Sequence, residues 1–247
     1  MSALTSFGAP MRVALFGATG GVGAALLDLL AGDDRVGGIY AGSRSSVIAE
    51  RPTVTPFQFD ITREETIADT AACISEGGPL DLVLVTTGVL HEGSMQPEKT
   101  WRDFSGDSFA HAFAVNATGP ALIAKHMLPL LARDRKSVFA ALSARVGSIE
   151  DNRLGGWASY RASKAALHQI VRTCAIELAR SRKQAICVAL HPGTVDTDLS
   201  RPFQRGVAAE KLFTPAYSAE RLLSVIDRLT LADSGNAFAW DGARIPF

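Results

Sequence analysis

Short apolar runs alternate with longer amphipathic stretches along most of the chain. The apolar runs have the length of buried strands, and we expect strands near Val13–Phe16, Gly38–Gly42, Pro56–Phe59, Leu80–Thr86, Ser137–Leu142, Ala185–Leu190 and Asn236–Trp240. Apolar residues at helical spacing, with Pro215 as a start signal for the last segment, predict helices near Val22–Ala31, Glu64–Ser75, Phe109–Arg133, Ala158–Arg180 and Ser218–Leu229. This alternation predicts an α/β fold with a doubly wound parallel sheet that carries helices on both faces.

A glycine-rich turn links the first expected strand to the first expected helix. Gly17, Gly21 and Gly23 have the spacing G-x-x-x-G-x-G, which opens the turn wider than the dinucleotide fingerprint G-x-G-x-x-G. A strand, a turn and a helix in this order aim the first backbone N–H groups of the helix at an anion in the turn. The alternative is a connection that binds nothing. The position of the turn after the first strand favours the anion site.

Tyr160 and Lys164 are the strongest candidates for catalytic chemistry. They are four residues apart, so a helix places the phenol and the ammonium on one face, where the cation favours the phenolate. A free phenol titrates near pH ~10 and is a poor proton-transfer group at neutral pH without such help. Pairs of this kind also occur by accident on exposed helices, so their meaning depends on the other motifs of the chain.

The motifs together resemble those of the short-chain dehydrogenase/reductase family over essentially the whole chain. The glycine turn, Asn116, the Tyr160/Lys164 pair and Pro192–Thr197 occur in the family's order and spacing. Three short strings resemble the subgroup that contains the bacterial C-factor and the sniffer-type carbonyl reductases, and these are Val146–Asn152, Gly155–Trp157 and Asp241–Pro246. The resemblance implies a single-domain Rossmann fold over residues 1–247, with about seven strands. It also implies an oxidoreductase that transfers a hydride between a nicotinamide cofactor and its substrate. The reaction interconverts a carbonyl compound and a secondary alcohol.

The resemblance gives three residues catalytic roles. Tyr160 would transfer the proton, Lys164 would lower the pKa of Tyr160 and hold the ribose, and the backbone carbonyl of Asn116 would anchor a water that reaches the lysine. The sequence supports the last role, because Pro120 lacks the N–H that would bond the Asn116 carbonyl inside a helix. The alternative is a buried amide that caps or bends the helix.

The end of the second expected strand indicates which cofactor is bound. Relatives specific for NAD carry an acid there that binds the ribose hydroxyls and repels a 2′-phosphate, whereas this chain has Ser43 followed by Arg44. The planar cation of Arg44 suits a phosphate, so we expect NADP(H) rather than NAD(H). A solvated loop arginine is the alternative. The second basic residue of many NADP enzymes is absent, since Ala18, Thr19 and Gly20 occupy that part of the turn.

The family pattern also implies a set of cofactor contacts along the strand ends. These positions are Gly17, Thr19, Gly20, Gly21, Val22, Gly23, Ser43, Arg44, Asp60, Ile61, Thr87, Gly88, Leu142, Ser143, Tyr160, Lys164, Pro192, Gly193, Val195 and Thr197. Asp60 could instead serve the start of the next helix, with Thr62 as a candidate N-cap. Val85–Gly88 departs from the family's Asn-Asn-Ala-Gly, and its threonines must replace amide side chains that hold the loop.

The catalytic serine of the family is the main departure. An ungapped alignment puts Ala144 at the position whose hydroxyl helps to bind the reacting carbonyl. Ser143 should face the opposite side of the strand unless a bulge turns it inward, and Ser148 is a further candidate. Loss of one donor to a developing oxyanion typically costs about 10²–10³ in rate. The sequence therefore leaves open a slow enzyme, or a protein that senses NADP(H) and turns over little.

Composition limits the partners. The chain has 247 residues, 47% of them hydrophobic, and a net charge of zero, which excludes a basic field for nucleic acid or anionic membrane. Residues 1–10 show no basic start followed by an apolar stretch, and no apolar run reaches the ~18 residues of a membrane span, so we expect a cytoplasmic protein. The three cysteines are Cys73, Cys174 and Cys187, and their wide separation within apolar patterns predicts reduced thiols in the core and no metal site.

Two further expectations concern the surface. The segment from Asp198 to Thr214 carries scattered apolar and basic residues without firm periodicity, which is typical of a mobile cover over a substrate site. The helix that carries Tyr160 has more apolar positions than one side needs for its own sheet. Since relatives commonly pair through this helix, we expect a homodimer or homotetramer.

Overall fold

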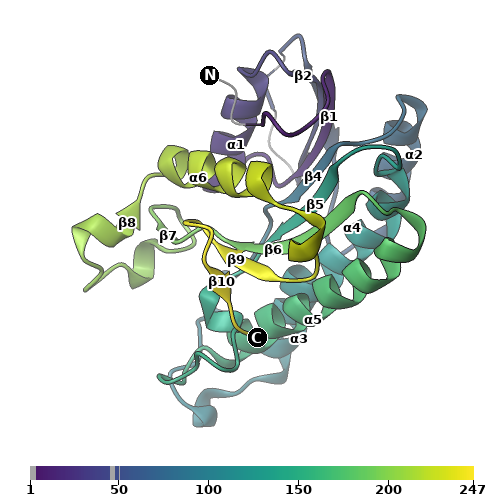
Figure 1. Ribbon diagram of the computed structural model, residues 1–247. Helices are drawn as coiled ribbons and strands as arrows, with labels where there is room; N and C mark the ends of the chain where they lie inside the picture. The colour runs from purple at the N-terminus through teal and green to yellow at the C-terminus, as the bar shows by residue number, and fades with distance from the viewer. Residues whose placement is uncertain (1–3, 45–47, 50) are drawn as a thin grey trace.

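The computed structural model describes residues 4–44, 48–49 and 51–247, which form an α/β fold around one large sheet (Figure 1). The sheet has eight strands in the order β10-β9-β6-β5-β4-β1-β2-β3. Their bounds are β1 Met11–Phe16, β2 Val36–Ser43, β3 Val54–Gln58, β4 Leu82–Val85, β5 Ser137–Leu142, β6 Ala185–His191, β9 Ala237–Ala239 and β10 Arg244–Ile245. The order reverses between β1 and β4, where doubly wound folds bind their ligands.

The strands are parallel except at one edge. All six residues of β1 except Arg12 are buried, as expected for a strand with helices on both sides. The seven expected strands are all present, and the sheet gains one more, because β10 turns back and pairs antiparallel with β9. The closing segment was too short and too polar to reveal β10 by periodicity.

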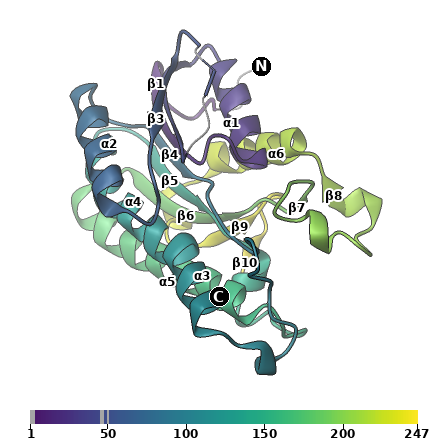
Figure 2. The same ribbon diagram turned by 180° about the vertical axis from the view of Figure 1, so that it is seen from behind.

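Helices cover both faces of the sheet (Figures 1 and 2). One face carries α1 (Gly21–Ala31) and α6 (Pro215–Arg228), whose Leu26 and Leu222 belong to one buried cluster. The other face carries α2 (Glu64–Glu76), α4 (Gly119–Met127) and α5 (Ala158–Ser181), with Ile67, Ile123 and Leu167 in a second cluster. The sheet therefore separates two hydrophobic cores, and the expected doubly wound fold is confirmed.

The single helix expected over Phe109–Arg133 is wrong. The segment consists of α3 (Gly106–Phe113), a π-helical turn (Ala114–Thr118), α4, and a short 3-10 helix that ends at Leu130. Pro120 has no N–H for the Asn116 carbonyl, and the chain widens at this point, so that the Gly119 N–H bonds Ala114 O. The break places Asn116 inside the π turn.

The expected substrate cover forms a small lobe beside the sheet (Figure 1). It contains the two-stranded sheet of β7 (Thr194–Val195) and β8 (Leu212–Phe213), with short 3-10 helices at Arg201–Phe203 and Ala209–Lys211. The remaining 3-10 helices are Trp101–Asp103, Arg145–Gly147 and Leu231–Asp233.

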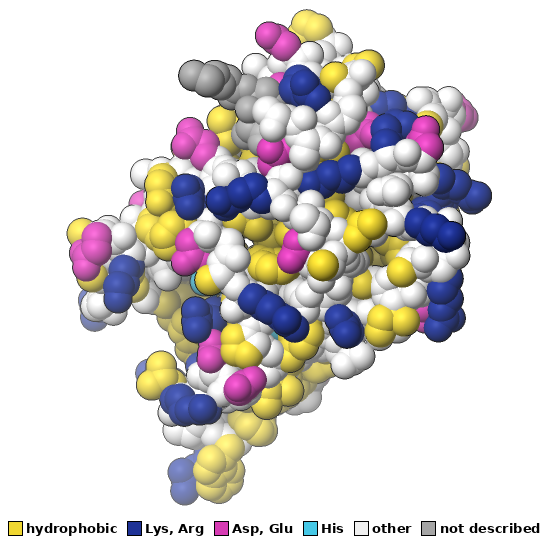
Figure 3. All heavy atoms as spheres, viewed as in Figure 1, with side chains coloured by type: hydrophobic (Ala, Val, Ile, Leu, Met, Phe, Trp, Pro, Cys, Tyr) yellow, Lys and Arg dark blue, Asp and Glu magenta, His cyan; other side chains and the backbone are white. Residues whose placement is uncertain are grey.

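No helix in the described ranges has the length and apolar character needed to cross a bilayer. On the face shown in Figure 3, basic and acidic side chains are interspersed.

Candidate active site

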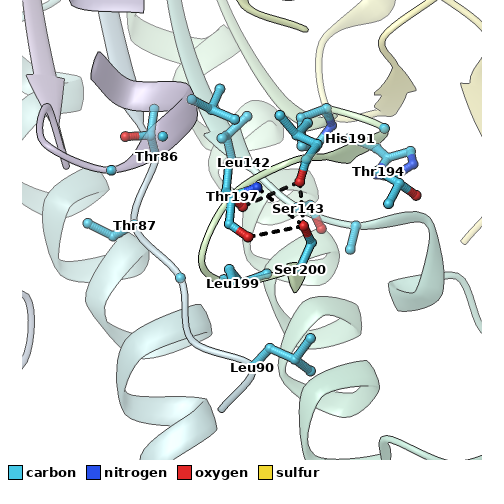
Figure 4. Close-up of a pocket in the computed structure, with 18 of the residues that line it drawn as sticks. Thr86, Thr87, Leu90, Leu142, Ser143, His191, Thr194, Thr197, Leu199 and Ser200 are labelled. Atoms are coloured by element: carbon cyan, nitrogen blue, oxygen red, sulfur yellow. Dashed lines mark hydrogen bonds between the residues drawn. The ribbon is translucent and has the colours of Figure 1, made fainter. Parts of the chain in front are cut away.

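A cavity of about 860 Å³ opens at the carboxyl ends of β1, β4, β5 and β6. Its volume suits a dinucleotide and a small substrate. Figure 4 shows Thr86, Thr87 and Leu90 on one wall, and His191, Thr194 and the loop through Ser200 on the other. The two walls come from segments that follow different strands, so the sheet topology itself creates the cavity.

The glycine turn forms the cavity wall at the start of α1. Gly17 has φ 94°, and a side chain there would press on Thr86 Oγ1, while a side chain on Gly23 would overlap the Gly17 carbonyl. Thr86 Oγ1 donates towards Phe16 O (2.9 Å) and Gly17 O (3.0 Å), so this threonine ties the turn to β4. The first turn of α1 has no acidic residue, which leaves its N–H groups and positive dipole end for an anion.

Tyr160 and Lys164 lie side by side in the cavity wall. The lysine Nζ is 5.9 Å from the centre of the tyrosine ring and donates to Leu142 O at 3.0 Å. Both side chains are almost fully buried, at 8% and 3% exposure. Burial raises the pKa of Tyr160 to about 12 and lowers the pKa of Lys164 to about 7. At neutral pH the Tyr160 phenol is therefore protonated and neutral. The Lys164 amine is protonated in about half of the molecules at pH 7.

Asn116 lies next to this pair but does not line the cavity. Its Oδ1 accepts the Val89 N–H (2.9 Å), and its Nδ2 donates to Val89 O (2.8 Å) and Ser163 Oγ (3.1 Å). The side chain therefore joins the loop after β4 to the helix that carries Tyr160 and Lys164. The sequence pointed to the backbone carbonyl of Asn116 and missed this link, because the partners lie far away along the chain.

The strand end at Ser143 continues without a bulge. Ser143 N–H bonds Leu190 O (2.7 Å), and Ala144 is extended, with φ −147° and ψ 147°. Ser143 Oγ lies 2.8 Å from His168 Nε2 on α5, so its hydroxyl is committed to the buried histidine. Burial, and then the charge of Lys164, lower the pKa of His168 to about 4. Ala144 lines the cavity where the family hydroxyl would be expected.

Arg44 is the cation at the far end of the cavity. It lines the cavity, its side chain is 73% exposed, and its Nη1 lies 3.5 Å from Glu92 Oε1. Glu92 also lies 2.8 Å from His111 Nε2, so this carboxylate joins α3 to the end of β2. Ser43, the last residue of β2, is buried and does not line the cavity.

Asp60 serves the turn before α2. Its Oδ1 accepts the N–H (2.8 Å) and the hydroxyl (2.7 Å) of Thr62, and these hydrogen bonds lower the pKa of Asp60. Thr62 as the N-cap is wrong, because Arg63 occupies that position. Ile61 packs on Gly119, where a side chain would collide with it. Both Asp60 and Ile61 lie outside the cavity lining.

Aromatic side chains surround the opposite end of the cavity. Phe203 of the small lobe packs on Trp157 with ring centres 5.1 Å apart, and Trp157 lies 6.4 Å from the Tyr160 ring. His91 contacts the same Phe203 ring at 5.6 Å, and its Nε2 lies 3.2 Å from Asp198 O. The lobe therefore contacts Trp157 and His91 through Phe203, and Trp157 in turn contacts Tyr160.

A family model described as Enoyl-(Acyl carrier protein) reductase, one of the models of short-chain dehydrogenases/reductases, matches residues 35–228. The chain belongs to the short-chain dehydrogenase/reductase family. It is thus a member of a family of oxidoreductases. The expected family and fold are confirmed.

Two curated relatives are similar to this chain. C-signal of Myxococcus xanthus is 32% identical over 69% of this chain and 94% of its own length. A dehydrogenase of Rhodococcus sp. (strain AD45), which is named for 1-hydroxy-2-glutathionyl-2-methyl-3-butene, is 33% identical over 74% of this chain and 76% of its own length.

Two solved structures share the fold. The carbonyl reductase Sniffer of D. melanogaster superposes with a TM-score of 0.83 at 19% identity, covering 97% of this chain and 100% of that one. A short-chain dehydrogenase/reductase from Burkholderia multivorans with bound NADP superposes with a TM-score of 0.77 at 25% identity, covering 96% and 99% of the two chains.

Most of the cofactor positions implied by the short-chain dehydrogenase/reductase pattern line the cavity. These are Thr19, Gly20, Gly21, Val22, Gly23, Arg44, Thr87, Gly88, Leu142, Ser143, Tyr160, Lys164, Pro192, Gly193, Val195 and Thr197. The cofactor positions outside the lining are Gly17, Ser43, Asp60 and Ile61, and the catalytic candidate Asn116 also lies outside it. Residues that line it without having been predicted as a site include Leu90, Arg145, Val146, Trp157 and His191. Val146 and Trp157 carried a sequence signal, since they belong to the strings Val146–Asn152 and Gly155–Trp157.

Proposed function

We propose that this protein is an NADP(H)-dependent reductase that interconverts a carbonyl compound and a secondary alcohol. The observation that carries the proposal is the buried Tyr160/Lys164 pair, which faces the same cavity as the open first turn of α1. The N-cap residue Gly20 is open, since a side chain there would meet only Gly17 O at 3.6 Å, whereas Thr197 lies against Gly21. A phosphate-bearing cofactor fits these residues, and a bound nicotinamide would supply the hydride.

Residues of this chain would supply the proton that the reduced carbonyl oxygen takes up. Because its pKa is about 12, Tyr160 carries its proton at neutral pH and can donate it to the oxygen of the reduced carbonyl. Protonated Lys164 would stabilise the phenolate that remains, and its pKa of about 7 lets it return a proton. Asn116 would fix the position of the loop after β4 relative to Lys164, because its side chain is hydrogen-bonded both to Val89 of that loop and to Ser163 of α5.

The choice of NADP(H) rests on Arg44 and on the absence of an acid at the end of β2. The Burkholderia relative with bound NADP supports this choice. In the structure Arg44 is paired with Glu92, so a 2′-phosphate would compete with that carboxylate for the guanidinium.

We expect NADPH to bind several-fold more tightly than NADH, and Arg44→Ala to remove most of the difference. Glu92→Gln should tighten NADPH binding by at most about fivefold, because an exposed ion pair contributes about 0–1 kcal/mol. The same variant should leave NADH binding unchanged, since NADH lacks the 2′-phosphate. Fluorescence titration with each cofactor measures the dissociation constants of the unmodified protein and of both variants.

A suitable control is Asp28→Asn, which breaks an exposed pair with Arg51 (2.6 Å) at residues that do not line the cavity. It should change neither dissociation constant. Equal affinities of the unmodified protein for NADPH and NADH would contradict the assignment.

The substrate end of the cavity favours an apolar carbonyl compound. Its lining between Tyr160 and the small lobe consists mostly of apolar and aromatic side chains, with Asp198 and Ser200 as polar neighbours, and the apolar and aromatic residues are Leu90, Val146, Trp157, Leu199, Phe203 and Val207. Arg145 also lines the cavity, and its guanidinium is paired with Asp151 at 2.9 Å. A panel of aldehydes and ketones with NADPH, followed by loss of NADPH absorbance, tests the function directly.

Ala144→Ser should raise kcat for a carbonyl substrate by at least about tenfold. Ala144 leaves Tyr160 as the main donor to the substrate oxygen, and a second donor at this site is worth about 10²–10³ when well placed. Steady-state kinetics on both proteins measures the gain. Ser143→Ala is the matched control. Its kcat should stay close to that of the unmodified protein, because the Ser143 hydroxyl is bonded to His168 and does not contact the substrate. Loss of activity in Ser143→Ala with none gained in Ala144→Ser would contradict this geometry.

A second candidate function is an NADP(H)-binding sensor with little turnover. The missing hydroxyl at Ala144 favours it, as does the similarity to the relative named C-signal. Tight NADPH binding without NADPH oxidation by any carbonyl of the panel would favour the sensor over the reductase.

A further inference from the structure

The helix that carries Tyr160 and Lys164 begins without a cap of its own. Its N-cap residue is Trp157, which makes no capping hydrogen bond through its side chain. A helix of 24 residues exposes several N–H groups and a positive dipole end at this point. Because Tyr160 lies in the first turn, the way these groups are satisfied decides where its hydroxyl lies.

Glu98 supplies the missing cap from a loop on another part of the chain. Its backbone carbonyl accepts the Trp157 N–H at 2.6 Å, and its side-chain Oε2 accepts the Ser159 N–H at 3.2 Å. The residue is only 3% exposed. Its other oxygen, Oε1, is buried and has no hydrogen-bond partner within the described ranges. A buried carboxylate oxygen in that state costs stability, so stability alone does not explain a glutamate here.

The segment that brings the start of α5 to Glu98 has three consecutive residues with positive φ. Gly155 and Gly156 both have φ 66°, and Trp157 has φ 55°, a left-handed conformation that costs a non-glycine residue about 1–2 kcal/mol. Arg161 holds the path from the other side, since it donates to Gly156 O (2.9 Å) and Gly155 O (3.2 Å). The Trp157 indole packs edge-on against the rings of Tyr160 and Phe203.

We propose that Glu98 is a positioning residue for the reaction, which acts through the first turn of α5. By binding the N–H groups on both sides of Ala158, it fixes the start of the helix and hence the Tyr160 hydroxyl and the Trp157 ring. The inference rests on the proposed reductase function. A displacement of about 1 Å at a reacting group can cost about 10²-fold in rate, so a cap at this place controls the rate as well as stability.

The test compares Glu98→Ala, Glu98→Asp and Glu98→Gln in the full chain. Glu98→Ala should lower kcat by about 10–100-fold and leave the Kd for NADPH within about twofold. Glu98→Gln should keep most of kcat, because its amide oxygen still accepts the Ser159 N–H. Glu98→Asp, which withdraws the carboxylate by one methylene, should give an intermediate kcat and covers the case that the alanine variant does not fold.

Asp81→Asn provides a matched control for burial. Asp81 is fully buried, accepts the Arg12 N–H at 2.8 Å, and lies at the opposite end of β4 from the cavity. It should lower the free energy of unfolding without changing kcat. An unchanged kcat in folded Glu98→Ala or Glu98→Asp would overturn the proposal, and so would a parallel loss of NADPH affinity.

Hydrogen exchange of residues 155–165 separates this proposal from the proposed function. Glu98→Ala, or Glu98→Asp in its place, should speed exchange of the Ser159 amide in the presence of NADPH, whereas Asp81→Asn should not. This readout needs no turnover, so it still decides the role of Glu98 if the unmodified protein reduces none of the carbonyl compounds. Unchanged exchange in the Glu98 variants would show that the carboxylate does not hold the helix.

Discussion

Tyr160→Phe should lower turnover of a carbonyl substrate by about 10²–10⁴-fold, the usual contribution of a positioned general acid. NADPH binding should change little, because the substitution removes only the hydroxyl. Within the described part of the chain, that hydroxyl has no hydrogen-bond partner that would shift its pKa, and Tyr160 is almost fully buried. The free energy of unfolding should therefore stay within about 1 kcal/mol of the unmodified value. Single-turnover kinetics and urea unfolding measure the two effects.

Tyr40→Phe is the matched control for this variant. The Tyr40 hydroxyl accepts a hydrogen bond from Arg12 Nη2 at 2.6 Å, and the residue does not line the cavity. The control should lose about 1 kcal/mol of stability and keep its turnover. Appreciable activity in Tyr160→Phe would mean that another group supplies the proton.

Lys164→Met should abolish most turnover and yet stabilise the cofactor-free protein below pH 7. Burial lowers the pKa of Lys164 from 10.5 to about 7, so between these values the unfolded chain binds more protons than the folded one. Stability of the unmodified protein should therefore rise with pH by about 2–3 kcal/mol between pH 7 and pH 9. The methionine variant should lack this rise, and urea unfolding at pH 6, 7 and 9 would show it.

Lys183→Met tests whether the rise of stability with pH is caused by the burial of the Lys164 amine. Lys183 is exposed just beyond the end of α5, so its replacement should leave the pH dependence of unfolding unchanged. If Lys164→Met is less stable than the unmodified protein at pH 6, the hydrogen bond from Lys164 Nζ to Leu142 O outweighs the cost of burying the amine.

The sequence predicted the parts of this protein that depend on local patterns. Seven of the eight strands of the large sheet, the glycine turn and the Tyr160 helix follow from periodicity and from short motifs, whereas β10 does not. The ungapped interpretation of the β5 end assumed no bulge, and the backbone there is extended through Ala144. The broken helix at Asn116 was only half anticipated. Pro120 showed that a carbonyl loses its partner, but a single sequence does not say whether the helix bends, ends or widens into a π turn.

Contacts between distant segments were beyond the reach of sequence patterns. Glu98 and Ser159 are 61 positions apart, and Arg44 and Glu92 are 48 apart. Neither glutamate belongs to a motif, and each looks like an ordinary polar loop residue. Trp157 was visible as part of a short string, but its left-handed backbone depends on the carbonyl of Glu98, which only the folded chain brings close.

Two neutral imidazoles beside the cavity set an acid limit on the fold itself. Burial lowers the pKa values of His168 and His191 to about 4, against 6.5 in the unfolded chain. The unfolded chain therefore takes up protons first as the pH falls, and the stability that depends on these residues is lost between about pH 6.5 and pH 4. Enzyme assays in mildly acidic buffer would then report a shrinking folded population, and a fall in rate there should not be assigned to the proton chemistry of Tyr160.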